Sequence, residues 1–227
     1  MKMAIISDIH GNYPALCAVL EQVKKMSCSL IISLGDIAGY YCMLNECIDI
    51  CRRNGVINIL GNHDHYLING VECMRSMTAN VCLKYQKGII LPENLEWLRA
   101  SILEYRMHHY WFVHGGWSDL LEQYVDSIDF TRFSDCGATL LASGHTHIQT
   151  IQKNDGITYI NPGSVGQPRD GDPRAAFAII DIAGDVTLCR VEYDIDSIAN
   201  AMKIKGFERR YYDGLYSGTK IQQFDRQ

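Results

Sequence analysis

Five short apolar segments of this chain each end in a loop of polar residues, and this recurrence constrains the fold more than any other feature. The loops carry Asp8, Asp36, Asn62, His114 and His145, and each follows a stretch as hydrophobic as a buried strand. In open α/β sheets, ligands bind at the carboxyl ends of the strands. Loops that meet at one edge would therefore bring their polar side chains together in a single site.

The segments around these loops predict an α/β protein with mixed sheets. Strands are expected over residues 2–7, 30–34, 56–60, 110–113 and 139–143. Helices are expected from Pro14, over 44–53, within 70–100 and over 194–205. Later in the chain, Asn154-Asp155-Gly156 and Ala183-Gly184-Asp185 are turn sequences typical of β-hairpins.

Length and charge set broad limits on organisation and partners. The 227 residues are enough for one sizeable core, so we expect one domain over 1–227, with an irregular tail over about 206–227. The 21 basic and 26 acidic residues give a net charge of −5, which disfavours binding of nucleic acid through the overall field. No stretch is apolar enough for a signal peptide or a membrane span, so we expect a cytoplasmic protein with no membrane partner.

The cysteines give a similar indication of the compartment. Nine cysteines form an odd set without framework spacing, which is typical of reduced thiols in the cytosol. Cys42, Cys47 and Cys51 lack the paired spacing of a zinc site, so we interpret them as packing residues on one helix.

The polar loops offer carboxylate, imidazole and amide ligands, a mixture that suits Mn, Fe, Co, Ni or Zn. In Asp8-x-His10 and His145-x-His147, an extended backbone would point both side chains of a pair the same way, because a strand has a period of two. Glycines before three of the ligands leave room for backbone to crowd the metals. One such loop alone is weak evidence, but five in order are specific.

Taken in order, the motifs Asp-x-His, Gly-Asp, Gly-Asn-His-Asp, His-Gly and Gly-His-x-His resemble the calcineurin-like metallophosphoesterase superfamily, from Asp8 to about Gly166. Residues 161–169, with the sequence Asn-Pro-Gly-Ser-Val-Gly-Gln-Pro-Arg, also look like the small bacterial members predicted to be phosphodiesterases. The resemblance implies a fold in which two mixed β-sheets pack as a sandwich flanked by helices.

The resemblance also implies roles for individual residues. One metal would be bound by Asp8, His10 and His147, the other by Asn62, His114 and His145, with Asp36 bridging both. The cofactor would be two divalent ions, Mn first, with Fe, Ni, Co or Zn as alternatives, and a hydroxide between them would attack phosphorus. His63 would be the catalytic residue that donates a proton to the leaving alkoxide or stabilises the phosphoryl charge.

The expected function is hydrolysis of a small phosphodiester or nucleotide. Protein phosphatases and symmetric diadenosine tetraphosphatases of this superfamily carry Arg-Gly shortly after Gly-Asp, whereas here Asp36 is followed by Ile37-Ala38-Gly39. The chain also offers no second aspartate to orient His63. A phosphomonoesterase or protein phosphatase is therefore the alternative. A catalytically weak scaffold, like the retromer subunit of this fold, is another, although every ligand position is filled here.

Several residues keep two interpretations. Asn12 either caps the first helix or contacts substrate. Arg169 either binds a phosphate or is a solvated loop charge. His108 and His109 are expected at the surface, and residues 209–212 are expected to dock onto their own domain. The sequence predicts a small phosphate ester as substrate, but neither its identity nor the oligomeric state.

Overall fold

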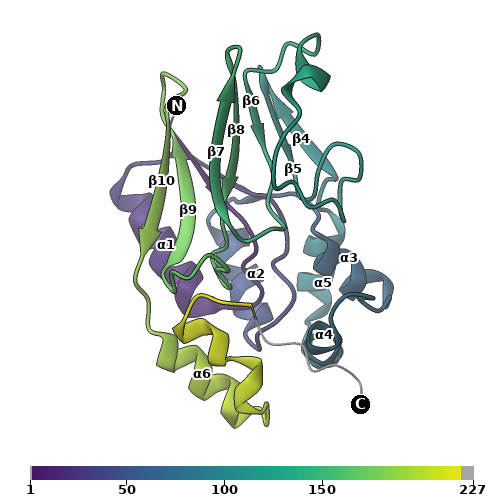
Figure 1. The fold of residues 1–227 in the computed structure, drawn as a ribbon. Helices are drawn as coiled ribbons and strands as arrows, with labels where there is room; N and C mark the ends of the chain where they lie inside the picture. The colour runs from purple at the N-terminus through teal and green to yellow at the C-terminus, as the bar shows by residue number, and fades with distance from the viewer. Residues whose placement is uncertain (1, 221–227) are drawn as a thin grey trace.

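The computed structural model describes residues 2–220, which form two mixed five-stranded sheets packed face to face with helices around them (Figure 1). The first sheet has the order β10 (Val186–Val191), β9 (Ala175–Ile180), β1 (Met3–Ile6), β2 (Leu30–Ser33), β3 (Ile57–Asn58). The second has the order β4 (Glu104–Met107), β5 (Tyr110–Val113), β6 (Leu140–Ala142), β8 (Ile157–Pro162), β7 (Gln149–Asn154). The predicted sandwich of two mixed sheets is confirmed.

The helices of the described residues lie close to their predicted positions, except the helix that begins at Asn62, where the sequence predicted only a polar loop. They are α1 (Tyr13–Lys25), α2 (Leu44–Arg53), α3 (Asn62–Asn69), α4 (Met77–Ile89), α5 (Pro92–Arg99) and α6 (Ile195–Ile204). Within residues 2–220 there are also three short 3-10 helices, η1 (Phe130–Phe133), η2 (Arg209–Tyr211) and η3 (Asp213–Tyr216). In the described part of the chain, none of the helices has the length and apolar character needed to cross a bilayer.

Strand β1 shows how the two layers share one hydrophobic segment. Ala4 and Ile6 are buried against the helices that cover the first sheet, whereas Met3 and Ile5 pack toward the second sheet in a cluster with Phe112. Successive side chains of a strand point to opposite faces, so a strand buried on both faces needs a continuous apolar run. That requirement explains why the segment lacks an alternating pattern.

Parallel pairing places the polar loops at matching strand ends. Strands β1, β2 and β3 are parallel in the first sheet, and β5, β6 and β8 are parallel in the second. The five polar loops follow β1, β2, β3, β5 and β6. Because parallel strands end at the same edge, each sheet brings its own loops together, and the sandwich brings the two sets together.

Several smaller expectations can be compared with the structure. Asn12 caps α1, since its side chain accepts a hydrogen bond from the Ala15 N–H at 3.3 Å. Cys47 and Cys51 pack in the core on α2 as expected, but Cys42 lies before this helix and joins a different core cluster. The helical segment expected within 70–100 begins only at Met77, because residues 70–76 form a loop.

The C-terminal segment docks onto the domain, as expected from the sequence. Tyr211 and Leu215 are buried in a cluster with Met202 of α6 and Cys82 of α4. Residues 221–227 of the expected tail lie outside the described residues.

Gln149 ties the two sheets together through its side chain. Its Nε2 lies 3.2 Å from the carbonyl oxygen of Pro162 in β8, and 3.1 and 3.0 Å from those of Phe177 in β9 and Cys189 in β10. Its Oε1 accepts a hydrogen bond from Arg190 Nε at 2.7 Å. One half-buried amide therefore satisfies polar groups from both layers.

Replacing Gln149 with leucine should weaken this connection. The Gln149→Leu variant leaves backbone carbonyls and a guanidinium N–H without partners, so we expect a loss of about 1–3 kcal/mol in the free energy of unfolding, measured by urea denaturation. Lys153→Leu, at an exposed position of the same strand, should change the free energy by no more than about 0.5 kcal/mol. Equal losses in both variants would show that Gln149 has no special role.

Candidate metal centre

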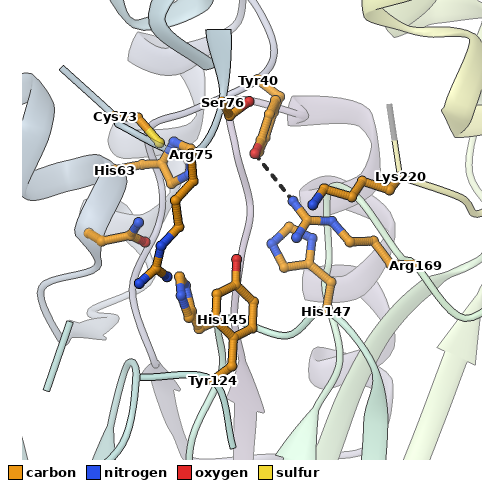
Figure 2. A pocket seen from close by; sticks show the side chains of 11 residues that line it. Tyr40, His63, Cys73, Arg75, Ser76, Tyr124, His145, His147, Arg169 and Lys220 are labelled. Atoms are coloured by element: carbon orange, nitrogen blue, oxygen red, sulfur yellow. Dashed lines mark hydrogen bonds between the residues drawn. The ribbon is translucent and has the colours of Figure 1, made fainter. Parts of the chain in front are cut away.

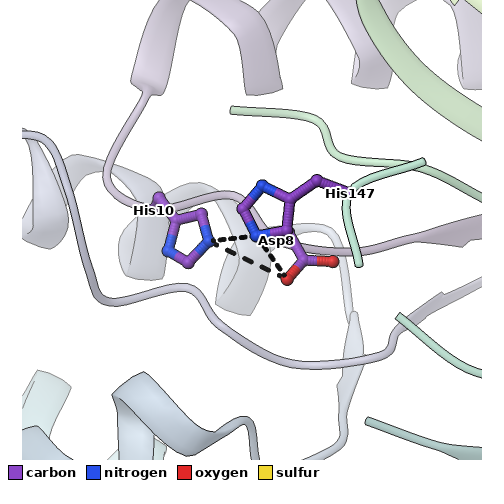
Figure 3. A group of neighbouring side chains, drawn as sticks. All are labelled: Asp8, His10 and His147. Carbon is purple, nitrogen blue, oxygen red and sulfur yellow. Dashed lines mark hydrogen bonds and ion pairs between the residues drawn. The ribbon is translucent and has the colours of Figure 1, made fainter. Parts of the chain in front are cut away.

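The structure brings the seven predicted metal ligands together at the shared edge of the two sheets. All seven are buried: Asp8, His10, Asp36, Asn62, His114, His145 and His147. The side chains form three groups, and within each group the ligand atoms lie within 4.8 Å of one another. The groups are Asp8, His10 and His147; Asp36, His114 and His145; and His10, Asp36 and His63. Figure 3 shows the first group. Proximity is therefore observed, while ligation of a metal stays a prediction.

The backbone at this site differs from the expectation. Asp8, His10, Asp36, His145 and His147 have φ angles from 53° to 67°, in the left-handed region. The prediction of an extended backbone at Asp8-x-His10 and His145-x-His147 is therefore wrong. Asp8 and His10 converge because the chain turns sharply at both, whereas His145 and His147 belong to different groups. Each such residue costs roughly 1–2 kcal/mol, so the surrounding contacts must enforce it.

Hydrogen bonds at Nδ1 fix three of the imidazole rings. The distances from Nδ1 to a carbonyl oxygen are 2.8 Å from His10 to Ala38, 2.8 Å from His114 to Leu34, and 2.6 Å from His147 to Gln167. A carbonyl oxygen only accepts, so each Nδ1 carries the hydrogen and each Nε2 keeps its lone pair.

These lone pairs face other acceptors at short range. His10 Nε2 lies 3.1 Å from His147 Nε2, which lies 3.2 Å from Asp8 Oδ1 (Figure 3). His114 Nε2 lies 3.0 Å from Asn62 Oδ1. Ligand atoms about 2.0–2.2 Å from one cation are roughly 3 Å from each other, so the spacing matches a shared ion. Without a cation, these acceptors would repel one another.

Three unpaired atoms of the candidate ligands support the same interpretation. Asp8 Oδ1, Asp36 Oδ2 and His145 Nε2 are buried and have no hydrogen-bond partner among the described residues. Buried polar atoms are nearly always paired, so an unpaired set within one cluster indicates a partner of another kind. Carboxylate oxygens and imidazole nitrogens are ligands of divalent metals. The residues therefore fit divalent metal ions, as expected from the sequence.

Burial also sets the protonation of the cluster. It lowers the pKa values of His10, His145 and His147, which favours the neutral imidazole that a metal needs. Burial, followed by the nearby carboxylates of Asp64 and Asp8, raises the pKa of Asp36 well above its usual value. A cation beside Asp36 would counter this effect and favour the ionised carboxylate.

Asp64, which the sequence analysis left without a role, shapes the loop that carries Asp36. It is fully buried, and its carboxylate accepts backbone N–H groups of Asp36 at 2.9 Å, Ala38 at 2.8 Å and Gly61 at 3.3 Å. The same carboxylate lies in the first turn of α3. Its position in the Gly-Asn-His-Asp motif was the signal that could have indicated this role.

The motif that begins at Asn161 fastens ligand loops from both sheets. Asn161 Nδ2 donates to Gly144 O at 2.7 Å and to Thr146 Oγ1 at 3.0 Å, so it holds the loop between His145 and His147. Ser164 Oγ donates to the carbonyl oxygen of Asp8 at 2.7 Å. The motif therefore supports the candidate ligands without contributing one itself.

Glycines allow the loops to crowd together, as predicted. A Cβ atom on Gly61 would lie 2.0 Å from Asp36 Oδ1, and one on Gly144 would lie 2.1 Å from Ser7 Oγ. Neither contact is sterically allowed, so only glycine leaves the Asp36 carboxylate and the first polar loop in place.

A pocket opens beside the cluster, and His63 lies in its wall (Figure 2). His63 Nε2 lies 4.0 Å from Asp36 Oδ2, and its Nδ1 is buried with no hydrogen-bond partner among residues 2–220. This agrees with the expectation that no second carboxylate orients the ring. Burial, followed by the charge of Arg169, lowers the pKa of His63 to about 3.

Several residues that line this pocket were not identified from the sequence. They are Tyr40, Cys73, Arg75, Ser76, Tyr124 and Lys220. They come from four separate segments without a motif, so no local pattern could have grouped all of them. His108 and His109 are exposed, as expected.

Comparison with known proteins gives the evolutionary context. A family model of the calcineurin-like phosphoesterase superfamily domain matches residues 1–185. The chain is 34% identical to an uncharacterized protein of Methanocaldococcus jannaschii over 221 residues, which cover 85% of this chain and 88% of that protein. It is 24% identical to phosphodiesterase YfcE of Escherichia coli over 80% of this chain and 88% of that protein. The structure resembles a metallophosphoesterase from Sphaerobacter thermophilus with a TM-score of 0.85 and 30% identity. The match covers 96% of this chain and 99% of that chain.

The low pKa of His63 predicts how the metal-free protein responds to acid. With a folded pKa of about 3 against 6.5 ordinarily, the unfolded chain binds a proton that the folded chain does not. Stability is therefore retained above pH 6.5 and lost as the pH falls toward 3, by up to about 1.4 kcal/mol per pH unit. Urea denaturation in chelator should show a shallower loss for His63→Gln between pH 6.5 and 5.

The difference between wild type and His63→Gln should not change between pH 7.5 and 8.5, because neither the folded nor the unfolded His63 titrates there. Equal pH slopes below 6.5 would contradict the assigned shift.

Proposed function

Because the chain belongs to the calcineurin-like phosphoesterase superfamily, we propose that it is a metal-dependent phosphodiesterase that hydrolyses a small phosphodiester or nucleotide. The observation that carries this proposal is the buried set of facing lone pairs, which needs cations, beside a pocket lined by His63. The relationship to phosphodiesterase YfcE supports a diester over a monoester.

The proposed ligand sets follow the groups in the structure. One ion would be held by Asp8, His10 and His147, the other by Asn62, His114 and His145, and Asp36 would lie between them as the bridging ligand. Two divalent ions, with Mn preferred for its tolerance of oxygen and nitrogen ligands, would activate water and neutralise charge on the phosphoryl oxygens when bound.

His63 is proposed to assist departure of the leaving oxygen. It lies in the pocket wall next to the cluster, its ring is almost fully buried, and its Nδ1 has no hydrogen-bond partner among residues 2–220. A neutral imidazole keeps one N–H that can donate to the substrate, and a nearby phosphate anion raises its proton affinity. The backbone N–H of His63 donates to Asp36 Oδ1 at 2.8 Å, which fixes the His63 backbone relative to the proposed bridging ligand.

The remaining expectations belong to the same proposal. Residues 1–227 would form one domain, and the substrate would be a small phosphate ester, with no membrane partner and with small phosphodiesters or nucleotides favoured over nucleic acid. All nine cysteines are free, which supports a reducing compartment such as the cytoplasm.

Removal and return of metal tests the proposed function. Chelated protein, reloaded separately with Mn, Ni, Co or Zn, should hydrolyse bis-p-nitrophenyl phosphate in preference to p-nitrophenyl phosphate. His63→Ala should lower turnover about 100-fold or more with unchanged metal content, since proton donation contributes roughly 10²–10⁴. Asp36→Asn should lower both turnover and metal content. His109→Ala, at an exposed position, is the control that should retain wild-type activity.

The alternatives predict other results. Preference for the monoester would assign the protein as a phosphomonoesterase. Absence of turnover with every metal, in protein that holds about two ions, would contradict catalysis and favour a protein-binding scaffold.

A further inference from the structure

The pocket beside the metal cluster has an unusual charge distribution. Its lining includes three cations, Arg75, Arg169 and Lys220, and no carboxylate among the described residues (Figure 2). None of the three belongs to the ligand motifs. Their individual surroundings decide which of them is available to bind an anion.

Arg75 already has an acidic partner. Its guanidinium lies 3.3 Å from the carboxylate of Glu122, donates to the Glu122 carbonyl oxygen at 3.1 Å, and lies over the Tyr124 ring. Its charge is therefore largely compensated within the protein.

Arg169, in contrast, is held by neutral groups. Its Nη2 lies 2.7 Å from Gln167 Oε1 and 3.3 Å from Tyr40 Oη, and its Nε lies 3.2 Å from Gln167 Oε1. Within residues 2–220, it forms no ion pair with a carboxylate. The guanidinium is therefore held in a fixed orientation at the pocket while its charge is uncompensated.

Lys220 adds a second positive charge next to Arg169 (Figure 2). Partial burial, followed by the positive charge of Arg169, lowers the pKa of Lys220, although much of this residue is exposed. Lys220 also forms no ion pair in the described part of the chain. Two neighbouring cations repel each other unless an anion lies between them, so this side of the pocket favours a negatively charged ligand.

Gln167 connects this cationic pair to the metal cluster. Its carbonyl oxygen accepts the Nδ1–H of His147 at 2.6 Å, and its side chain holds Arg169. The position of Arg169 relative to His147 is thus fixed through one residue. An anion at Arg169 would lie beside the proposed metals, within the same pocket.

We infer that Arg169 and Lys220 form a phosphate-binding subsite beside the metal cluster. The inference rests on the proposed function insofar as the pocket is the substrate site. A guanidinium pairs with two phosphate oxygens through parallel N–H groups, which suits Arg169 to this ligand. The bound group is either the phosphate being cleaved or a second phosphate of the same substrate, and these two sources can be distinguished.

The test measures binding, so it does not depend on turnover. Inorganic phosphate serves as the one-phosphate probe and methylenediphosphonate as the two-phosphate probe, both titrated by calorimetry into the Mn-loaded full chain. Neither probe is hydrolysed. The variants are Arg169→Gln, Arg169→Lys and Lys220→Gln. Arg132→Gln removes an exposed charge that does not line the pocket and serves as the control. Metal content and thermal unfolding are measured for every variant.

Arg169→Gln should weaken binding about 10- to 100-fold, as expected when charge-assisted hydrogen bonds are lost. The affinity of Arg169→Lys for the probes should lie between those of Arg169→Gln and wild type. Lys220→Gln should weaken binding less than Arg169→Gln does. Equal weakening for both probes would place the cleaved phosphate at the subsite. Weakening confined to methylenediphosphonate would place a second phosphate there.

Unchanged affinity for both probes in Arg169→Gln and Lys220→Gln, with metal content retained, would overturn the inference. A weakening of the same size in Arg132→Gln would also overturn it, because the effect would then reflect net charge alone. If the protein binds phosphate through Arg169 but hydrolyses no ester, the subsite stands and the proposed function fails.

Discussion

Three hydrogen bonds from imidazole Nδ1 atoms to backbone carbonyl oxygens set the ring orientations and the tautomers in the candidate metal centre. They fix the rings of His10, His114 and His147, and they leave each Nε2 with a lone pair directed into the cluster. The bond from His114 to Leu34 also joins the second sheet to the first. With the opposite tautomers, hydrogens would fill the space where a cation is expected. The direction of the imidazole lone pairs thus depends on the positions of three backbone carbonyl groups, those of Leu34, Ala38 and Gln167.

The geometry of the ligand loops has an energetic cost that the rest of the fold must offset. Five left-handed residues at roughly 1–2 kcal/mol each approach the whole net stability of a typical domain, about 5–15 kcal/mol. Asp64 and Ser164 offset part of this cost through buried hydrogen bonds to the loop backbones. Bound ions would add stability that grows with the logarithm of their affinity, because the assembled ligand set exists in the folded arrangement. Packing and ion binding therefore support the same strained loops.

The sequence predicted much of the fold and the candidate ligands because each ligand lies in a short motif directly after a strand. It failed on backbone conformation, since Asp8 and His10 are left-handed and a two-residue spacing alone suggests an extended strand. The pocket lining was missed for a different reason. Tyr124 and Lys220 reach the site through tertiary structure, and nothing local in the sequence connects them. Arg169 stayed ambiguous until its neutral partners and its cationic neighbour were visible together.

The distribution of the cluster along the chain has a consequence for how the protein is made. The candidate ligands extend from Asp8 to His147, and the ring of His147 depends on the carbonyl oxygen of Gln167. A chain emerging from the ribosome therefore lacks the complete set of candidate ligands and their supports until Gln167 has been synthesised. Before that point, shorter segments can offer only partial ligand sets, which hold ions weakly. Any selection among the metals of the cell would therefore come after residues of both sheets have been synthesised.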